Sequence, residues 1–147
     1  MLKGKVAVVT GGTRGIGFET VRQFLLNGAK VALCGSREET VVKAVDKLKT
    51  ENAAFEVEGF FPNLSKEAEV AQMMAAFKAK YGNIDILVNN AGISSSTPLL
   101  NYTEDEFDKI SNLNIKSVFV CSKAVVPYLK ETKGVILNTS SMVSMYG

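Results

Sequence analysis

The 147-residue chain contains no histidine. This absence excludes catalytic triads that use an imidazole, zinc sites with histidine ligands and histidine general bases. Any proton transfer by this chain must therefore use Asp, Glu, Lys, Tyr or a network of hydroxyl groups.

Cysteine is scarce, with only Cys34 and Cys121 in the whole sequence. Their spacing matches no metal site and indicates no disulfide pair. We therefore expect two reduced thiols in a cytoplasmic protein, and no metal site.

Excess charge and long apolar runs are also missing. The net charge is +2, which is too small to indicate a nucleic-acid or membrane partner. No apolar run approaches the roughly 20 residues of a membrane-spanning helix. The N-terminal stretch MLKGKVAVVTGG reaches a glycine-rich turn after one strand's length and does not resemble a signal peptide. Length and composition predict one soluble globular domain, residues 1–147.

Short β-rich runs alternate with helical patterns along the chain. The expected strands are residues 5–10, 30–34, 54–61, 85–92 (with the exit turn) and 135–138. The expected apolar helix faces are Ile16, Thr20, Phe24 and Leu25; Val41, Val42, Val45 and Leu48; Val70, Met73, Met74, Phe77 and Tyr81; and Phe107, Ile110, Val118, Cys121 and Val125. Ser65 is a predicted helix cap, and Thr103 with Glu106 forms a predicted capping box. This order indicates an α/β fold with a parallel sheet covered on both faces.

Polar and glycine-rich segments follow every expected strand. Because ligands of open parallel sheets bind beyond the carboxyl ends of the strands, these segments predict a binding cleft. The alternative is that turns are simply polar. The segments are TGGTRGIG, GSRE, FPNLS, NNAGISSS and TSSM.

The first of these segments, TGGTRGIG, joins a buried strand to a helix. Gly11, Gly15 and Gly17 lack a Cβ at this sharp turn, which lets backbone N–H groups approach a pyrophosphate at the positive helix N-terminus. The spacing is G-x-x-x-G-x-G, not the usual G-x-G-x-x-G. A tight structural turn is the alternative interpretation.

TGGTRGIG followed by NNAG (residues 89–92) resembles the classical short-chain dehydrogenase/reductases, and the resemblance covers the whole chain. It implies a Rossmann-type doubly wound sheet of five strands in the order 3-2-1-4-5, in three αβα layers. It also implies hydride transfer between a nicotinamide cofactor and a carbonyl or alcohol. The implied cofactor-binding residues here are Gly11, Thr13, Arg14, Gly15, Ile16, Gly17, Asn90, Ala91 and Gly92.

The residues after the second expected strand bear on the choice of cofactor. An acidic side chain there would bind the adenosine ribose of NAD(H). This chain instead has Ser36 and Arg37, and Arg14 lies in the glycine turn. Two guanidinium groups suit a 2′-phosphate, so we expect NADP(H) in preference to NAD(H). The alternative is that Arg37 is merely solvated. Asn63 and Leu64 are expected beside the adenine, where the family commonly has Asp at the first position.

Two expected catalytic residues lie in the second half of the chain. Asn114 falls within an apolar helical stripe, where a buried amide needs hydrogen-bond partners. It either bonds nearby backbone or, as the resemblance implies, holds a helix kink and a relay water. Ser141 matches the family serine that hydrogen-bonds the substrate oxygen, and without a histidine to activate it we do not expect a nucleophile.

The Y-x-x-x-K motif, which supplies the family's acid/base, is absent from this sequence. Tyr146 has no lysine at the required spacing and is interpreted as a loop aromatic. We expect a C-terminally truncated domain that is inactive alone, with an open sheet edge that makes it marginally stable or self-associating. The full-length form is expected to be a homodimer or homotetramer.

The substrate stays open among 3-oxoacyl thioesters, steroids or bile acids, and sugars or small ketones. Two non-enzymatic alternatives also remain: a nucleotide-binding regulatory module without catalysis, and an interaction scaffold.

Overall fold

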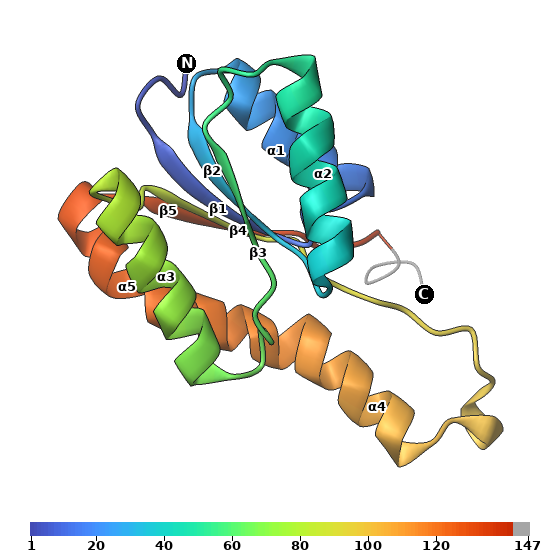
Figure 1. Ribbon diagram of the computed structural model, residues 1–147. Coiled ribbons are helices and arrows are strands. Elements are labelled where there is room, and N and C mark those ends of the chain that lie inside the picture. Colours follow the sequence, from blue (N-terminus) through green and yellow to red (C-terminus); the bar gives the residue numbers. More distant parts are fainter. Residues whose placement is uncertain (143–147) are drawn as a thin grey trace.

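A parallel sheet of five strands forms the middle layer of the molecule, in the order β3-β2-β1-β4-β5 (Figure 1). The computed structural model describes residues 1–142. The strands are β1 (Val6–Thr10), β2 (Lys30–Cys34), β3 (Val57–Phe60), β4 (Ile86–Asn89) and β5 (Val135–Asn138). The predicted fold class and strand order are therefore confirmed.

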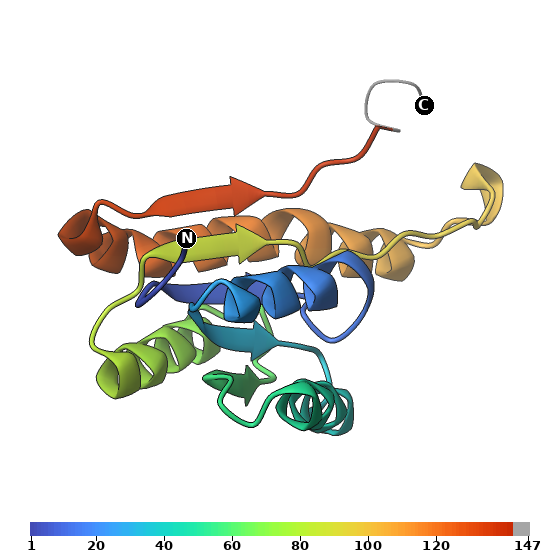
Figure 2. The ribbon, with the colours of Figure 1, turned by 90° about the horizontal axis from the view of Figure 1, so that it is seen from above.

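Helices cover both faces of this sheet (Figures 1 and 2). On one face α1 (Gly15–Leu26) and α2 (Glu38–Glu51) enclose a core with Ala7 and Val9 of β1. On the other, α3 (Glu67–Tyr81) and α5 (Ser117–Thr132) enclose a core with Val6 and Val8. Because β1 is buried on both sides, all of its residues are buried, as its unbroken apolar run predicts.

The inward faces of α1 and α2 differ from the predicted ones. Ile16 is 74% exposed, whereas Gly17 points inward with Val21 and Leu25. In α2, Val42 is exposed and Ala44 is buried with Val41 and Leu48. Two of the inward positions hold small residues, Gly17 and Ala44, where the helices pack closely on the sheet, and a search for large apolar residues passes over them.

Two local boundaries were also predicted incorrectly. The third strand begins at Val57 and not at residue 54, because a turn follows α2, in which the side chain of Asn52 accepts a hydrogen bond from Ala54 N at 3.0 Å. Ser65 does not cap α3: Lys66 is at the cap position without a side-chain hydrogen bond, and Ser65 Oγ donates to Asn63 Oδ1 at 2.8 Å.

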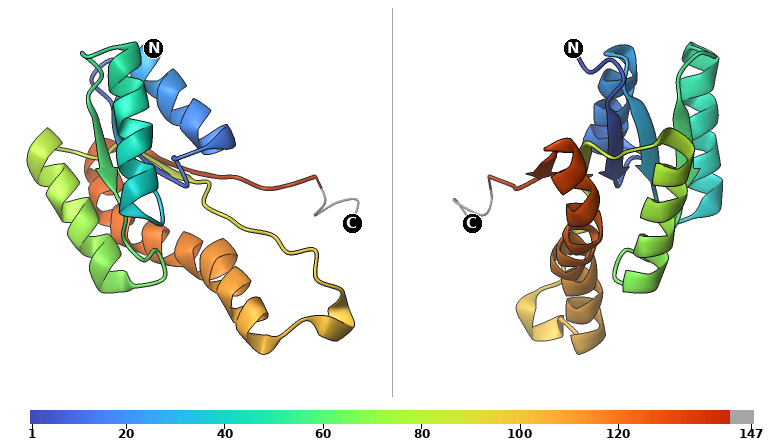
Figure 3. Two further views of the ribbon diagram at one scale, coloured as in Figure 1. Left: turned by 45° about the vertical axis from the view of Figure 1, so that its right-hand side comes forward. Right: turned by 90° about the vertical axis from the view of Figure 1, so that its left-hand side faces the viewer.

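The predicted long helix consists of three segments. They are α4 (Glu104–Ser111), a π-helical turn (Asn112–Lys116) and α5. Figure 3 shows α4 extending beyond the sheet, so the predicted face residue Phe107 is exposed, while Cys121 and Val125 of α5 are buried. Within residues 1–142, none of the helices combines the length and the apolar character needed to cross a membrane.

Cys34 and Cys121 are both free thiols in the core of the α3–α5 face. Cys34 Sγ lies 3.3 Å from Met73 Sδ. Burial raises the pKa of the Cys121 thiol to about 12 and raises the pKa of Cys34 as well. Both side chains are therefore neutral packing residues and not nucleophiles.

Candidate functional site

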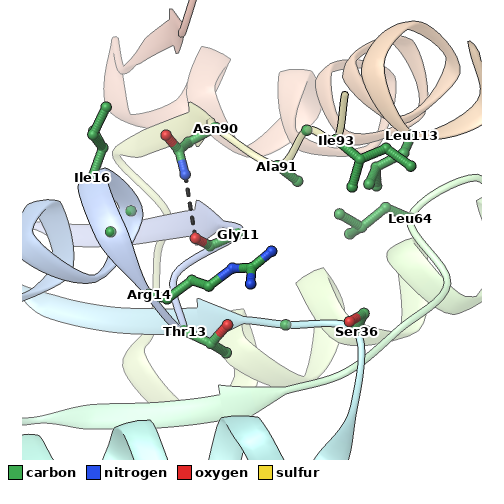
Figure 4. Close-up of a pocket in the computed structure, with 14 residues that line it drawn as sticks. Gly11, Thr13, Arg14, Ile16, Ser36, Leu64, Asn90, Ala91, Ile93 and Leu113 are labelled. Carbon is green, nitrogen blue, oxygen red and sulfur yellow. Dashed lines mark hydrogen bonds between the residues drawn. The ribbon is translucent and has the colours of Figure 1, made fainter. Parts of the chain in front are cut away.

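A cavity of about 380 Å³ opens at the carboxyl ends of β1, β2 and β4 (Figure 4). This volume falls within the roughly 300–1,000 Å³ typical of ligand pockets. Its lining residues are Gly11, Thr13, Arg14, Gly15, Ile16, Gly17, Gly35, Ser36, Leu64, Asn90, Ala91, Gly92, Ile93 and Leu113. The cavity therefore lies where the polar strand ends predicted a cleft.

The glycine turn gives one side of the cavity its shape. A Cβ at Gly17 would overlap the Gly11 carbonyl oxygen, so only glycine allows α1 to begin this close to the end of β1. Gly15 has φ +55°, and no atom lies within 4 Å of a Cβ placed there. The turn therefore presents open backbone to the cavity at Gly15 while it packs tightly at Gly17.

Thr10 and Asn90 join the glycine turn to β4. Thr10 Oγ1 accepts hydrogen bonds from Asn90 N and Ala91 N, each at 3.0 Å. Asn90 Nδ2 donates to the carbonyl oxygens of Thr10 and Gly11, each at 3.2 Å, and Figure 4 shows the second of these bonds. Thr10 was not among the predicted site residues; the signal for it was a hydroxyl at the end of a strand that is otherwise apolar.

Electrostatics favour an anion at the start of α1. The first turn of this helix contains no acidic residue, and its N-terminal N–H groups have no partners within the helix. Arg14 stands at the cap position, and in Figure 4 its side chain extends into the cavity between Gly11 and Ser36. By contrast, the first turn of α2 contains Glu38 and Glu39.

Leu64, Ile93 and Leu113 form an apolar wall on the side of the cavity toward which Arg14 extends (Figure 4). Of these three residues only Leu64 was predicted at the site, and Gly35, which also lines the cavity, was not predicted there. A Cβ at Gly35 would lie 2.5 Å from Thr13 Cγ2. Ile93 and Leu113 are far apart in the sequence and meet here only because the π-helical turn packs beside the exit of β4.

Arg37 and Asn63 were predicted at the cofactor site but do not line the cavity. Arg37 is the exposed cap residue of α2, next to Ser36. The side chain of Asn63 accepts a hydrogen bond from Ser65 N at 3.0 Å, which orders the turn before α3.

Asn114 lies in the π-helical turn and is exposed, so its predicted burial was wrong. Its amide forms two hydrogen bonds with the backbone of Ile93: Oδ1 accepts from Ile93 N at 2.9 Å, and Nδ2 donates to Ile93 O at 2.8 Å. The side chain therefore reaches sideways to the loop after β4, which a helical pattern does not reveal.

Ser141 lies on the exposed segment that follows β5. This segment is tied to the glycine turn through Asn90, since Thr139 Oγ1 donates to Asn90 Oδ1 at 3.4 Å. Thr139 N also donates to Asn89 O at 2.9 Å. Tyr146, interpreted above as a loop aromatic, lies outside the described residues.

Comparison with known proteins agrees with this geometry. The family model for short chain dehydrogenases matches residues 5–147. A 3alpha-hydroxysteroid dehydrogenase of Mediterraneibacter gnavus is 54% identical over all of this chain, and a 3-oxoacyl-acyl-carrier-protein reductase of Chlamydia muridarum is 36% identical over all of it. The crystal structure of a short chain dehydrogenase from Mycobacterium smegmatis superposes with a TM-score of 0.89 at 32% identity, covering 97% of this chain.

The chain spans 59% of the length of these two curated relatives and 60% of that solved structure. Sequence motifs, strand order and the position of the cavity agree with the family match. This chain belongs to the short chain dehydrogenase family of oxidoreductases.

Proposed function

We propose that this chain is the NADP(H)-binding domain of an oxidoreductase that acts on the carbonyl or hydroxyl group of a small molecule. The observation that carries the proposal is the cavity formed by the glycine turn, with the α1 N-terminus and Arg14 directed into it. When bound, the nicotinamide cofactor accepts or donates the hydride.

The residues present fit a dinucleotide phosphate. The backbone around Gly15 has no side chain over it, so N–H groups at the start of α1 are accessible to phosphate oxygens. Asn90 and Ala91 hold that turn against β4, and Gly92 lines the cavity beyond them. Leu64, Ile93 and Leu113 supply the apolar surface that an adenine or nicotinamide ring requires.

The preference for NADP(H) over NAD(H) rests on charge. Ser36 and Arg37 follow β2, where an acidic side chain would repel a 2′-phosphate. Arg14 adds a second guanidinium group from the glycine turn. Together the two arginines can give a phosphate several charge-assisted hydrogen bonds.

For catalysis, we propose that Ser141 hydrogen-bonds the substrate oxygen and that Asn114 supports the proton relay. The two bonds to Ile93 use one amide proton and one oxygen lone pair of Asn114. The other proton and the other lone pair remain available for a further hydrogen bond. The chain has no Y-x-x-x-K sequence, so the proposed 147-residue domain binds cofactor without turning over substrate at the family rate.

Among the substrate classes, a hydroxysteroid has the strongest support. The relative at 54% identity is named a 3alpha-hydroxysteroid dehydrogenase. In this chain the loop after β4 carries Leu99 and Leu100, which are 87% and 97% exposed. Such apolar side chains, on a loop whose base borders the cavity at Ile93, suit the rigid apolar body of a steroid better than a sugar.

The cofactor assignment is tested by titrating the purified chain with NADPH and NADH and following nicotinamide fluorescence. We expect tighter binding of NADPH, and Arg14→Ala should weaken it at least about tenfold through loss of a charge-assisted bond. Arg37→Ala should reduce the preference for NADPH over NADH. Lys43→Ala, an exposed cation on α2, serves as the charge-matched control.

Equal affinity for the two cofactors, unchanged by either arginine substitution, would overturn the assignment of NADP(H). Binding of neither cofactor would overturn the nucleotide-binding proposal itself.

A further inference from the structure

Residues 93–102, here named the wall loop, connect β4 to α4 and border the cofactor cavity through Ile93. Figure 3 shows this loop running out beside α4, and only a short 3-10 turn, Leu99–Asn101, interrupts it. Side chains of the following helical segments bind it at two points. Asn114 bonds Ile93 at its base, as described above, and Glu106 of α4 bonds its middle.

Glu106 concentrates two hydroxyl groups of the wall loop on one carboxylate oxygen. Thr97 Oγ1 donates to Glu106 Oε1 at 2.8 Å, and Ser95 Oγ donates to the same oxygen. Thr97 N donates to Ser95 Oγ at 3.1 Å, which closes the cluster. The hydrogen bonds from Ser95 and then Thr97 lower the pKa of Glu106, as expected for a carboxylate that accepts both hydroxyl protons in its charged form.

The helix itself does not need this carboxylate. In a full capping box, the side chain of Glu106 would return to the backbone N–H of Thr103. Here only the other half is present, because Thr103 Oγ1 accepts from Glu106 N at 3.2 Å while the carboxylate binds the wall loop. Glu104 and Asp105 already supply negative charge to the first turn of α4.

We propose that Glu106 is a positioning residue for the substrate: it fixes the wall loop, whose base borders the cofactor cavity at Ile93, and so sets where Leu99 and Leu100 are presented. The substrate part of this inference rests on the proposed function. The positioning part rests on the hydrogen bonds of Glu106 alone. Glu106 contacts the loop and not the substrate, so its effect must pass through Ser95 and Thr97.

The test compares the unaltered chain with Glu106→Ala, Glu106→Gln and Glu104→Ala. In Glu106→Ala, we expect the amides of residues 94–97, including Thr97 N, to exchange with deuterium at least about tenfold faster, because two bonds to a charged group are lost. The exchange rates in Glu106→Gln should lie between those of the unaltered chain and those of Glu106→Ala, because the glutamine amide oxygen still accepts both hydroxyl protons. Glu104→Ala removes a carboxylate from the same turn and should leave loop exchange unchanged.

A second measurement separates positioning from general stability. With the chain saturated with NADP⁺, binding of a 3α-hydroxysteroid should weaken in Glu106→Ala and recover in Glu106→Gln. The NADP⁺ affinity should be the same in all four proteins.

Unchanged amide exchange in Glu106→Ala, or equal acceleration in Glu104→Ala, would overturn the proposed positioning role. An unaltered chain that binds NADP⁺ but no steroid would instead overturn the proposed substrate class, and the exchange rates would still decide the role of Glu106.

Discussion

At the residue scale, Gly15 and Gly17 of the same turn are required for different physical reasons. Gly17 has no room for a side chain, since a Cβ there would lie 2.5 Å from Asn90 Nδ2 and would overlap the Gly11 carbonyl. Gly15 has room, but its φ of +55° is strained for any residue with a Cβ. Gly17 is therefore needed for packing, and Gly15 is needed for its backbone conformation and for access to the backbone around it.

This difference predicts unequal costs for the same substitution. Gly17→Ala should lower the free energy of unfolding by about 2 kcal/mol or more, because helix α1 must move away from β1. Gly15→Ala should cost about 1 kcal/mol, from the left-handed backbone alone. Urea denaturation of the two variants measures both values, and a larger loss for Gly15→Ala would contradict the assignment.

At the element scale, α4 differs from the other α-helices because it has no buried residue. Its stability therefore depends on local interactions at its first turn and not on packing. Thr103 is the residue that caps it, through the 3.2 Å bond from Glu106 N. Ser65 has the same chemistry before α3 but bonds Asn63 instead.

Thr103→Ala should therefore fray the start of α4. Loss of an N-cap costs about 1 kcal/mol, which corresponds to roughly fivefold faster exchange of the amides of Glu106 and Phe107. Amide exchange followed by NMR is the measurement, and Ser65→Ala is the matched control, with no expected effect on the first turn of α3. Similar fraying of α3 in the control would show that Ser65 acts as a cap after all.

Sequence patterns predicted the order of the helices and strands better than their bounds, caps and inward faces. The β5 bounds and the cap at Thr103 both agree with prediction, because each depends on residues within a few positions of one another. The exposure of Asn114 and the partner of Glu106 did not follow from the sequence. Both side chains bond the wall loop, which adjoins their helices only in the folded chain.

At the scale of the whole molecule, β5 leaves apolar surface exposed. It lies at the end of the sheet beside β4, and its register pairs Val135 with Ile86 and Leu137 with Val88. Those partners belong to the core under α1 and α2, yet Val135 and Leu137 remain 47% and 48% exposed. Neither helix extends far enough across the sheet to cover them (Figure 2).

We expect the purified chain to self-associate through this surface, since an apolar sheet edge favours pairing with another chain. Leu137→Lys should shift the chain toward monomer in sedimentation velocity across a concentration series. Val42→Lys places the same charge at an exposed position of α2 and should not change association. A strictly monomeric unaltered chain, or an equal effect of both substitutions, would refute this expectation.

The sequence by itself determined the α/β class, the parallel order of elements and the glycine turn beside the cavity. These follow from local periodicity and from residues within one turn, whose physical meaning does not depend on distant neighbours. Only the tertiary structure decided that Ile93 and Leu113 complete the cavity, that Thr10 and Asn90 hold its floor together, and that Glu106 binds the wall loop. Each of those arrangements joins segments that meet only when the sheet and its covering helices pack.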